Sequence, residues 1–455
     1  MLLRFFRVND PYRLVFILLI LVITRVTYGV IGMPMSWPEL KHLLLGEWLA
    51  SGFAMYSETF DYTAPLSAWT FQGIDFVFGR SRTTHWVISG LILFTQAAIF
   101  NRTLLNNKVL SEPNYVSAFL YIIFSVALFD FFALSPQLMS LTWVIVSMDH
   151  LIRRMDNEAK DELFLFPGFY LGMAGLFYFP SIAFFIVFLF AMIVIVRAKL
   201  RRILLYIYGW ATAYLIVGVI LYIGGNLEDF LSVYFVEAIR AKIFYVSWYN
   251  LITWMLIPGF FFILSVFSAL GRREGSLHAK TQQFMLLVFL ACIGEILLSG
   301  TLSGTDLVFF LPVFTFFLTN YFIKVRRRIW KIILPNLMII SSLTAPYVGL
   351  RTELFGEGLI VTAEKSSVPV DSKLMIVGPL TSDYIESKIS GPFLDERIGL
   401  DRIEDLNYYH QSRVFQDIFL EAQPDLVIDE WGIMPLVQKR FPEVEKLKIE
   451  IRSSN

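Results

Sequence analysis

Long apolar runs separated by short polar stretches follow one another along the first 350 residues. Eight runs are long enough to cross the roughly 30 Å of bilayer hydrocarbon as α-helices, and they lie near residues 14–32, 86–104, 115–133, 202–224, 250–270, 282–299, 305–323 and 330–349. Three more, near 136–152, 164–178 and 180–196, are shorter or carry prolines at Pro136 and Pro180. The pattern therefore predicts a polytopic α-helical membrane protein with about eleven transmembrane helices.

The first of these runs resembles a signal peptide only at first sight. It continues from Leu14 to about Gly32 without a small-residue cleavage pattern, and many more runs follow it. A secretory signal has a shorter apolar core and ends at such a cleavage pattern. We therefore expect the run to be a retained first span.

Residues 65–78 form an apolar stretch that is too short to cross the membrane, and it contains Gln72 and Asp75. Basic residues, which cytoplasmic loops retain, support this interpretation. They cluster near residues 4–13, 102–108, 153–154, 197–202, 272–273 and 324–328. These basic clusters all lie on the same side of the membrane only if residues 65–78 do not cross it. We predict a re-entrant or interfacial helix there, a cytoplasmic N-terminus and, after eleven spans, an outer C-terminal segment.

After residue 350 the pattern changes from long apolar runs to short elements with charged residues between them. Residues 373–378 and 425–429 are typical of buried strands, and residues 412–421 are typical of an amphipathic helix. About a hundred residues suffice for one small layered domain. We expect a transmembrane domain over 1–350, with a first outer loop at 33–66, and a small α/β domain over 351–455 on the outer, periplasmic side.

The composition agrees with a membrane protein, since 56% of the 455 residues are hydrophobic, 17% are charged and the mean hydropathy is +0.63. The formal net charge of zero argues against a nucleic-acid partner. The single cysteine, Cys292, excludes a disulfide framework. The five histidines have no spacing typical of metal ligands, and no phosphate-binding or dinucleotide-binding glycine motif is present.

The first outer loop carries the candidate chemistry. Residues 39–50 show apolar positions at helical spacing, which predicts a helix lying in the membrane interface. Glu58 and Asp61 follow, and if that stretch were helical they would share one face with Cβ atoms about 5 to 6 Å apart. Such a pair could act as a base near neutral pH or hold a divalent cation. Alternatively, these are ordinary polar loop residues, and Pro65 simply begins the next helix.

The loop also carries a set of short motifs: LASG at 49–52, YSE at 56–58, FDYTAPL at 60–66 and FGRS at 78–81. LSP at 134–136 and GFYLGMAGL at 168–176 follow, with Pro180 after them. In this order the set resembles the GT-C superfamily of integral-membrane glycosyltransferases over about the first 200 residues. Two departures stand out. Trp37 and Pro38, followed by Glu39, occupy the register where many relatives have an acid after the first span, and Thr63 stands where relatives often have a lysine.

The resemblance implies a donor sugar on a polyprenyl phosphate and an envelope acceptor, which would be a lipid, glycan or protein. A carboxylate would deprotonate the acceptor hydroxyl, and the matching catalytic positions here are Glu58, Asp61 and Glu39. Substrate-binding candidates are Tyr56 and Tyr62 in the loop, together with the cations Arg80, Arg82, Arg240 and Lys242. Such cations could pair with a phosphate. Alternatively, Arg240 and Lys242 extend to lipid headgroups or pair with Glu237.

Two acids within the apolar part, Asp130 and Glu295, are costly there unless they are paired or line a cavity. We regard both as functional candidates, although Glu295 could simply face another helix.

Three functions remain open at this level. The first is a glycosyltransferase of the bacterial inner membrane. The second, favoured by the missing acid after the first span, is a non-catalytic membrane scaffold that supports envelope assembly or secretion. The third is a transporter with helices broken at Pro136 and Pro180.

Overall fold

The computed structural model describes residues 2–110, 112–155, 160–237, 243–270, 276–325, 329–351, 358–362, 368–404, 409–441 and 450–453. The chain forms two compact units. The first consists of residues 1–34, 85–217 and 242–359, and the second of residues 35–84, 218–241 and 360–455. The C-terminal segment is thus grouped with the first predicted outer loop and with residues 218–241, and the unit boundaries differ from a single division at residue 350.

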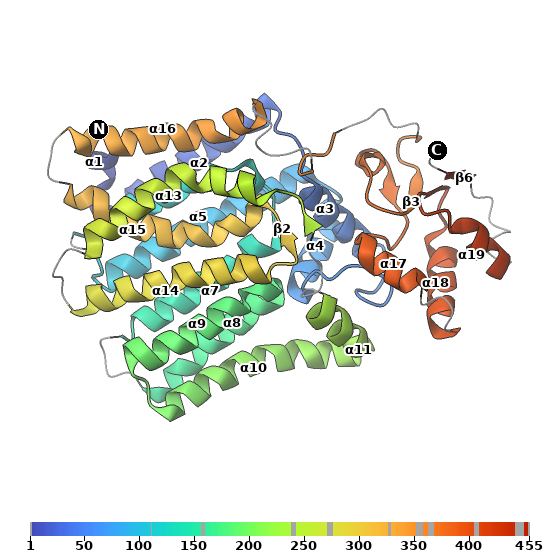
Figure 1. Cartoon of the computed structure of the whole chain (residues 1–455), viewed down its shortest axis with the longest axis horizontal. Helices are drawn as coiled ribbons and strands as arrows, with labels where there is room; N and C mark the ends of the chain where they lie inside the picture. The colour runs from blue at the N-terminus through green and yellow to red at the C-terminus, as the bar shows by residue number, and fades with distance from the viewer. Residues whose placement is uncertain are drawn as a thin grey trace. The chain divides into compact units, whose positions relative to one another are not determined.

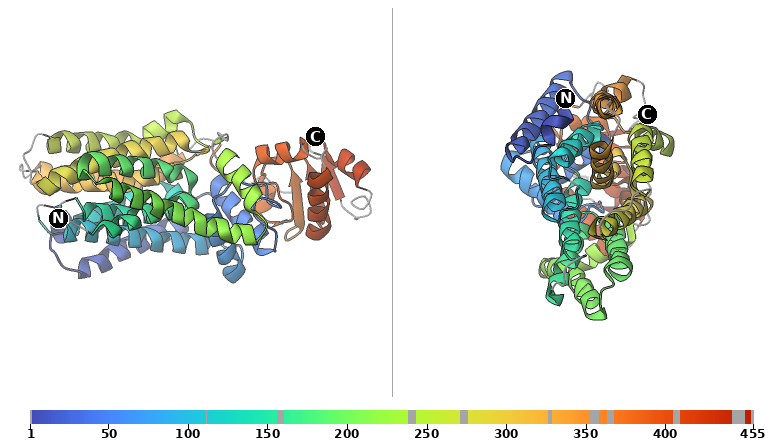
Figure 2. Two further views of the ribbon diagram at one scale, coloured as in Figure 1. Left: turned by 90° about the horizontal axis from the view of Figure 1, so that it is seen from below. Right: turned by 90° about the vertical axis from the view of Figure 1, so that its left-hand side faces the viewer.

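The first unit is a bundle of helices that run roughly alongside one another (Figures 1 and 2). Its longer helices are α2 (Tyr12–Ile31), α5 (Arg82–Asn106), α6 (Val116–Ser125), α7 (Pro136–Ile152), α8 (Leu165–Phe177), α9 (Ile182–Ala191), α10 (Leu200–Ile223), α13 (Trp248–Leu270), α14 (Ser276–Leu298), α15 (Phe310–Lys324) and α16 (Trp330–Arg351). Shorter elements are α1 (Leu2–Phe6), the turns η1 (Phe129–Phe132), η2 (Asp161–Phe164), η3 (Phe179–Ser181), η4 (Met192–Val196) and η6 (Gly304–Phe309), and the strands β1 (Ile243–Phe244) and β2 (Thr301–Leu302).

Contacts made near the ends of the helices define the two ends of this bundle. At one end lie the pairs Arg7 with the Ile323 carbonyl, His278 with the Val109 carbonyl, Lys280 with the Met155 carbonyl, and Arg202 with Asp161. At the other end lie the pairs Arg25 with the Phe131 carbonyl, Gln137 with Asp306, Tyr178 with Ser299, and Tyr245 with the Leu302 carbonyl. Followed along the chain, these contacts alternate between the ends, and α2, α5, α6 with η1, α7, α8, α9, α10, α13, α14, α15 and α16 make eleven passages.

Eight described helical segments have the length and composition to cross a membrane. The other three passages are shorter, since α6 has 10 residues, α7 has 17 and α8 has 13. The expected span at 115–133 is therefore wrong in its extent, because its helix ends at Ser125 and the chain continues through the separate turn η1. The multi-span helical architecture itself is confirmed.

Burial distinguishes the inside of the bundle from its rim. In each of these segments we compare the buried share of the most apolar 18-residue stretch. This share is 94% in the Gly304–Lys324 segment and 17% in α2. Large apolar side chains on α2, α10 and α13 are exposed, among them Val30, Ile223 and Phe267. A helix that keeps apolar residues all round is solvated by lipid when its outer face is uncovered. The bundle therefore places α15 at its centre and α2, α10 and α13 toward the hydrocarbon.

The second unit contains a parallel four-stranded sheet in the order β4 (Lys388–Ile389), β3 (Lys373–Val377), β5 (Leu426–Asp429), β6 (Glu450–Ser453). The turn η7 (Ser382–Ile385) and the helices α17 (Glu396–Glu404), α18 (Tyr409–Ala422) and α19 (Met434–Arg440) accompany it. The two strands and the helix predicted in this segment are confirmed as β3, β5 and α18. Runs such as LMIV at 374–377 are fully buried, as expected for central parallel strands.

The same unit contains the helices α3 (Trp37–Ala50) and α4 (Pro65–Phe78), together with α11 (Leu227–Phe230) and η5 (Leu231–Glu237). Helix α3 begins where the Ser36 hydroxyl accepts a hydrogen bond from the Glu39 amide. It packs closely on α4, because a Cβ at Gly46 would lie 2.9 Å from the Phe71 carbonyl oxygen.

Two expectations about these helices have different outcomes. The interfacial helix expected at 39–50 is wrong in its amphipathic character, because every residue from 39 to 46 is buried, which leaves no polar face. Helix α4 has 14 residues, about 21 Å at 1.5 Å per residue, too short to span the hydrocarbon alone. Its re-entrant or interfacial location remains a prediction.

Candidate functional site

The loop between α3 and α4 carries the predicted acids in an irregular conformation. Gly52 has a φ of +107° just after α3 ends, and residues 53–64 are turns and extended chain. Glu58 and Asp61 therefore do not share a helical face, contrary to the geometry considered above. The loop instead pairs with the C-terminal segment, since the Phe60 amide donates to the Pro392 carbonyl and the Asp395 amide donates to the Phe60 carbonyl, each at 2.9 Å.

Asp61 is completely buried, and a cation holds it. The Lys41 ammonium lies 2.6 Å from Asp61 Oδ1, and the Thr63 hydroxyl donates to Oδ2 at 2.6 Å. A second carboxylate, that of Asp395, lies 4.0 Å from the same ammonium group. The Tyr62 ring lies over it, 4.7 Å from Nζ to the ring centre. We call Lys41, Asp61 and Asp395 the lysine–aspartate cluster.

Burial raises the pKa of Asp395, the nearby Lys41 lowers it, and Asp61 raises it further. The partner that the sequence suggested for Asp61 was Glu58, whereas the structure supplies Asp395 from the distant C-terminal segment. Sequence reasoning missed Lys41 and Asp395. The only signal was a lysine inside the apolar run LKHLLL at 40–45, within the helix that the pattern predicts to lie in the membrane interface.

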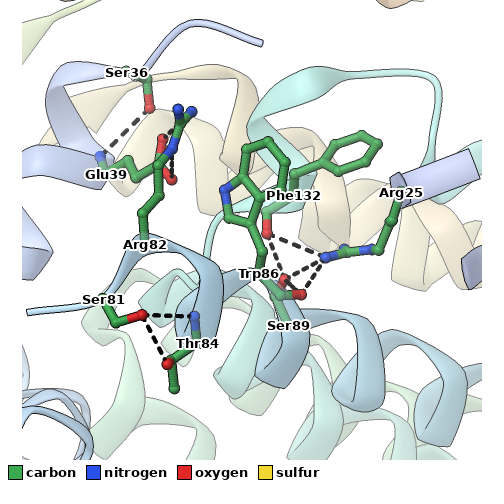
Figure 3. A network of polar contacts seen from close by, with 9 residues as sticks. All are labelled: Arg25, Ser36, Glu39, Ser81, Arg82, Thr84, Trp86, Ser89 and Phe132. Atoms are coloured by element: carbon green, nitrogen blue, oxygen red, sulfur yellow. Dashed lines mark hydrogen bonds and ion pairs between the residues drawn. The ribbon is translucent and has the colours of Figure 1, made fainter. Parts of the chain in front are cut away.

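Glu39 and Arg82 form a two-point ion pair (Figure 3), with Nε 2.8 Å from Oε1 and Nη2 3.0 Å from Oε2. Glu39 is only 4% exposed. Arg80 likewise contacts Glu47 at 2.9 Å and donates to the carbonyls of Ser387 and Ile385. Burial raises the pKa of Glu47, and Arg80 opposes that rise. Both predicted phosphate-binding arginines are thus already engaged with carboxylates in this structure.

Glu58 differs from the other two predicted acids. Its Oε2 accepts a hydrogen bond from the Ala54 amide at 2.7 Å, and the side chain is only half-buried. No ion pair joins Glu58 to a cation among the residues that the structure describes. Of the three candidates, Glu58 is therefore the carboxylate that remains both accessible and uncompensated.

The predicted tyrosines have distinct environments. Tyr56 is 1% exposed and has a φ of +71°, and its hydroxyl donates to the Thr63 carbonyl at 2.8 Å. Its own carbonyl accepts from Arg402 at 3.3 Å. Burial raises the pKa of Tyr56, and so does Asp61. Tyr56 holds the loop in shape, while Tyr62 is half-buried. Substrate binding by either residue stays a prediction.

Two further substrate-binding candidates, Arg240 and Lys242, lie outside the described residues. A divalent cation was the other expectation for this loop. Among the described residues, no group of three or more histidine, cysteine, aspartate or glutamate side chains is placed to hold a metal ion. The expected carboxylate pair does not offer such a site either, because Asp61 is bound to Lys41 instead.

The first unit contains a partly open apolar pocket. Aromatic and aliphatic side chains of α6, α13, α15, α16 and the turns beside them line it, including Phe124, Phe131, Trp254, Pro258, Leu307 and Phe314. Asp130, next to the lining residue Phe131, is 2% exposed and accepts the Gly304 amide at 3.1 Å.

Arg25 supports the same turn η1 from α2 (Figure 3). It donates to the carbonyls of Phe131 and Phe132 at 3.1 and 3.3 Å and to the Ser89 hydroxyl at 2.8 Å. The pocket wall is therefore fixed by hydrogen bonds at the end of the bundle where Asp130 lies.

No protein-family model matches this sequence, and no curated protein matches it significantly. Among solved structures, the crystal structure of ArnT from Cupriavidus metallidurans bound to undecaprenyl phosphate is similar, with a TM-score of 0.55 at 8% sequence identity. The match covers 98% of this chain and 90% of that chain. A similarity over nearly the whole length confirms the GT-C-like fold that the loop motifs suggested.

Proposed function

Because the chain has a GT-C-like fold, we propose that the protein is a membrane glycosyltransferase. It moves a sugar from a polyprenyl-phosphate-linked donor to a cell-envelope acceptor, which is a lipid, a glycan or a protein. The observation that carries the proposal is the similarity, over 98% of the chain, to a solved structure that holds undecaprenyl phosphate. The apolar pocket of the first unit supports it, because an isoprenoid tail needs an apolar, preformed chamber.

The proposed location is the bacterial inner membrane. Arg7, Arg202 and Lys280 make their contacts at the same end of the first unit. Cytoplasmic ends of membrane bundles are enriched in lysine and arginine. We therefore assign this end and the N-terminus to the cytoplasm, and the loop that carries Glu58 and the C-terminal segment to the periplasm.

In the proposed reaction, Glu58 is the general base. Its carboxylate takes the proton of the acceptor hydroxyl while that oxygen bonds to the anomeric carbon of the sugar. The bond from this carbon to the phosphate oxygen breaks, and the polyprenyl phosphate leaves with the electron pair. A general base must lie within hydrogen-bond reach of the proton that it removes and must be able to accept that proton. Glu58 meets the first condition better than Asp61, because its side chain is half-buried whereas Asp61 is completely buried, and in the described part of the chain no ion pair engages Glu58.

Asp61 and Glu39 take supporting roles in this proposal. Asp61 pairs with Lys41 and Glu39 with Arg82, so in this proposal both acids hold the loop in place. Arg240 and Lys242 remain the proposed sources of positive charge for the leaving phosphate. Arg80 and Arg82, which were predicted for the same role, would have to exchange Glu47 and Glu39 for the phosphate. A divalent cation at that phosphate is also part of the proposal, with no ligand assigned to it.

The test is sugar transfer by the purified protein in proteoliposomes. A panel of radiolabelled polyprenyl-phosphate sugars would be supplied as donors, and extracted envelope lipids and glycans as acceptors. We expect Glu58→Gln to lower the transfer rate by roughly 10²- to 10⁴-fold, the usual contribution of a general base. Binding of undecaprenyl phosphate, measured by native mass spectrometry, should not change.

Glu386→Gln is the matched control, because Glu386 is an exposed acid of the same unit. Its transfer rate should equal that of the wild type. If Glu58→Gln kept the full rate, Glu58 would not be the base. If the wild-type protein moved no sugar and bound no undecaprenyl phosphate, the proposed activity would be wrong.

The burial of Asp61 and Glu39 in ion pairs favours a second candidate, a non-catalytic scaffold for envelope assembly or secretion. In that case Glu58→Gln would complement a deletion strain fully. Deletion of residues 360–455 would not complement, because these residues share a compact unit with the loop.

A further inference from the structure

Glu295, in the last turn of α14, is a carboxylic acid enclosed in the membrane bundle. Its side chain is 0% exposed, and no ion pair joins it to a cation in the described part of the chain. Neither carboxyl oxygen has a hydrogen-bond partner of acceptable geometry. A titratable side chain in this situation inside a membrane protein is a functional candidate by default.

Asp306, in η6, is the carboxyl group that interacts with Glu295. Three donors point at it. Gln137 Nε2 lies 2.9 Å and the Tyr178 hydroxyl 3.0 Å from Oδ1, and the Ser303 amide lies 2.9 Å from Oδ2. A carboxyl group that accepts three hydrogen bonds is stabilised in its ionised form.

The Tyr178 hydroxyl interacts with both acids and also lies 2.8 Å from the Ser299 hydroxyl. Cys292, one turn earlier on α14, is a further titratable group that interacts with Glu295. Its thiol donates to the Phe309 carbonyl at 3.2 Å. No lysine, arginine or histidine interacts with this group in the described part of the chain.

Two interacting carboxylates that are both 0% exposed would repel each other if both were ionised, because the surrounding medium solvates neither of them. One proton removes the repulsion. The hydrogen-bond donors decide where it resides, because Asp306 receives three of them and Glu295 receives none of good geometry.

We infer that Glu295 and Asp306 form a membrane-buried proton-binding site that holds one proton, carried by Glu295, at neutral pH. The ligand is a proton rather than a metal ion, because only two acidic side chains take part. The inference does not depend on the proposed glycosyl transfer, since it concerns residues that have no part in that reaction.

The test is infrared spectroscopy of the full-length protein in dodecyl maltoside, a detergent without ester or carboxyl groups, in heavy water. A protonated carboxyl group gives a carbonyl band that ionised acids lack, so at neutral pH the band reports such groups alone. We expect the wild-type protein to show this band and to lose it as the pH rises. Glu295→Gln should lack it, and Asp161→Asn, which removes an acid held by Arg202 at 2.6 Å, should keep it.

Asp306→Asn provides the second measurement. Removal of the neighbouring charge makes Glu295 easier to ionise, so the band should disappear at a lower pH than in the wild type. This shift is readable even if Glu295→Gln does not fold. The proposal fails if the wild-type band is absent at neutral pH, or if Asp306→Asn leaves the titration unchanged. It also fails if sodium chloride, but not choline chloride, abolishes the band, because the ligand would then be a sodium ion.

Discussion

In the second unit Asp61 is fully buried and lies 2.6 Å from an ammonium group, whereas in the first unit Glu295 is equally buried and forms no ion pair with any cation that the structure describes. Both acids belong to clusters that contain a second carboxyl group, Asp395 and Asp306 respectively. The lysine–aspartate cluster balances charge with charge. In the Glu295–Asp306 pair, a bound proton neutralises one of the two carboxyl groups.

The comparison shows that the surroundings of a buried acid decide how its charge is neutralised. Lys41 lies on the buried helix α3, in the unit that also contains the charged α/β segment. A cation can therefore be placed beside the buried Asp61. Glu295 lies on a helix long and apolar enough to cross the membrane, where every extra charge costs several kcal/mol. Protonation is the less costly way to neutralise an acid in that position.

The largest effect that separates the two clusters is expected from Lys41→Met. The substitution removes the ammonium group that lies 2.6 Å from Asp61, while Arg397 still interacts with Asp395. Removal of one partner from a buried pair typically costs about 3–5 kcal/mol. We expect the free energy of unfolding to fall by about that amount, measured by denaturation in detergent. The double variant Lys41→Met with Asp61→Asn should recover part of the loss. Wild-type stability of the single variant would contradict the assigned role of Lys41.

A smaller effect is expected from a matched pair of amide substitutions, Asp61→Asn and Glu295→Gln. Asp61→Asn removes the carboxylate that lies 2.6 Å from Lys41 and keeps Asp395 at 4.0 Å, and we expect a loss of about 1–3 kcal/mol. Glu295→Gln replaces a neutral acid with a neutral amide of the same shape, so the change should stay below about 1 kcal/mol. If both variants lost the same free energy of unfolding in the same assay, the charge-paired cluster and the protonated pair would not differ as proposed.

The smallest effect is expected in the pH dependence of stability. Burial raises the pKa of Asp395 above its ordinary value, so the folded state binds this proton more tightly than the unfolded state. Its contribution to stability is therefore complete below the ordinary pKa and is lost as the pH rises through the raised one. Asp395→Asn should flatten that part of the profile, as followed by unfolding midpoints at stepped pH. An unchanged profile would show that Asp395 does not titrate in this way.

The local features of the chain were predictable from its residues. The apolar runs gave the multi-span architecture, and the buried runs at 373–378 and 425–429 became β3 and β5. The candidate site was predictable only in part. Glu39, Glu58 and Asp61 were identified as acids of the first outer loop, but their cationic partners were not.

Sequence by itself determined which segments are helical and apolar, because periodicity and length act within a few turns of chain. Tertiary structure alone decided that Lys41 lies between Asp61 and Asp395, and that Glu295 lies next to Asp306 rather than next to a cation. The physical reason is that the charge state of a buried acid depends on groups brought to it from other elements. No local pattern specifies those groups, so the chemistry of these acids follows from the fold.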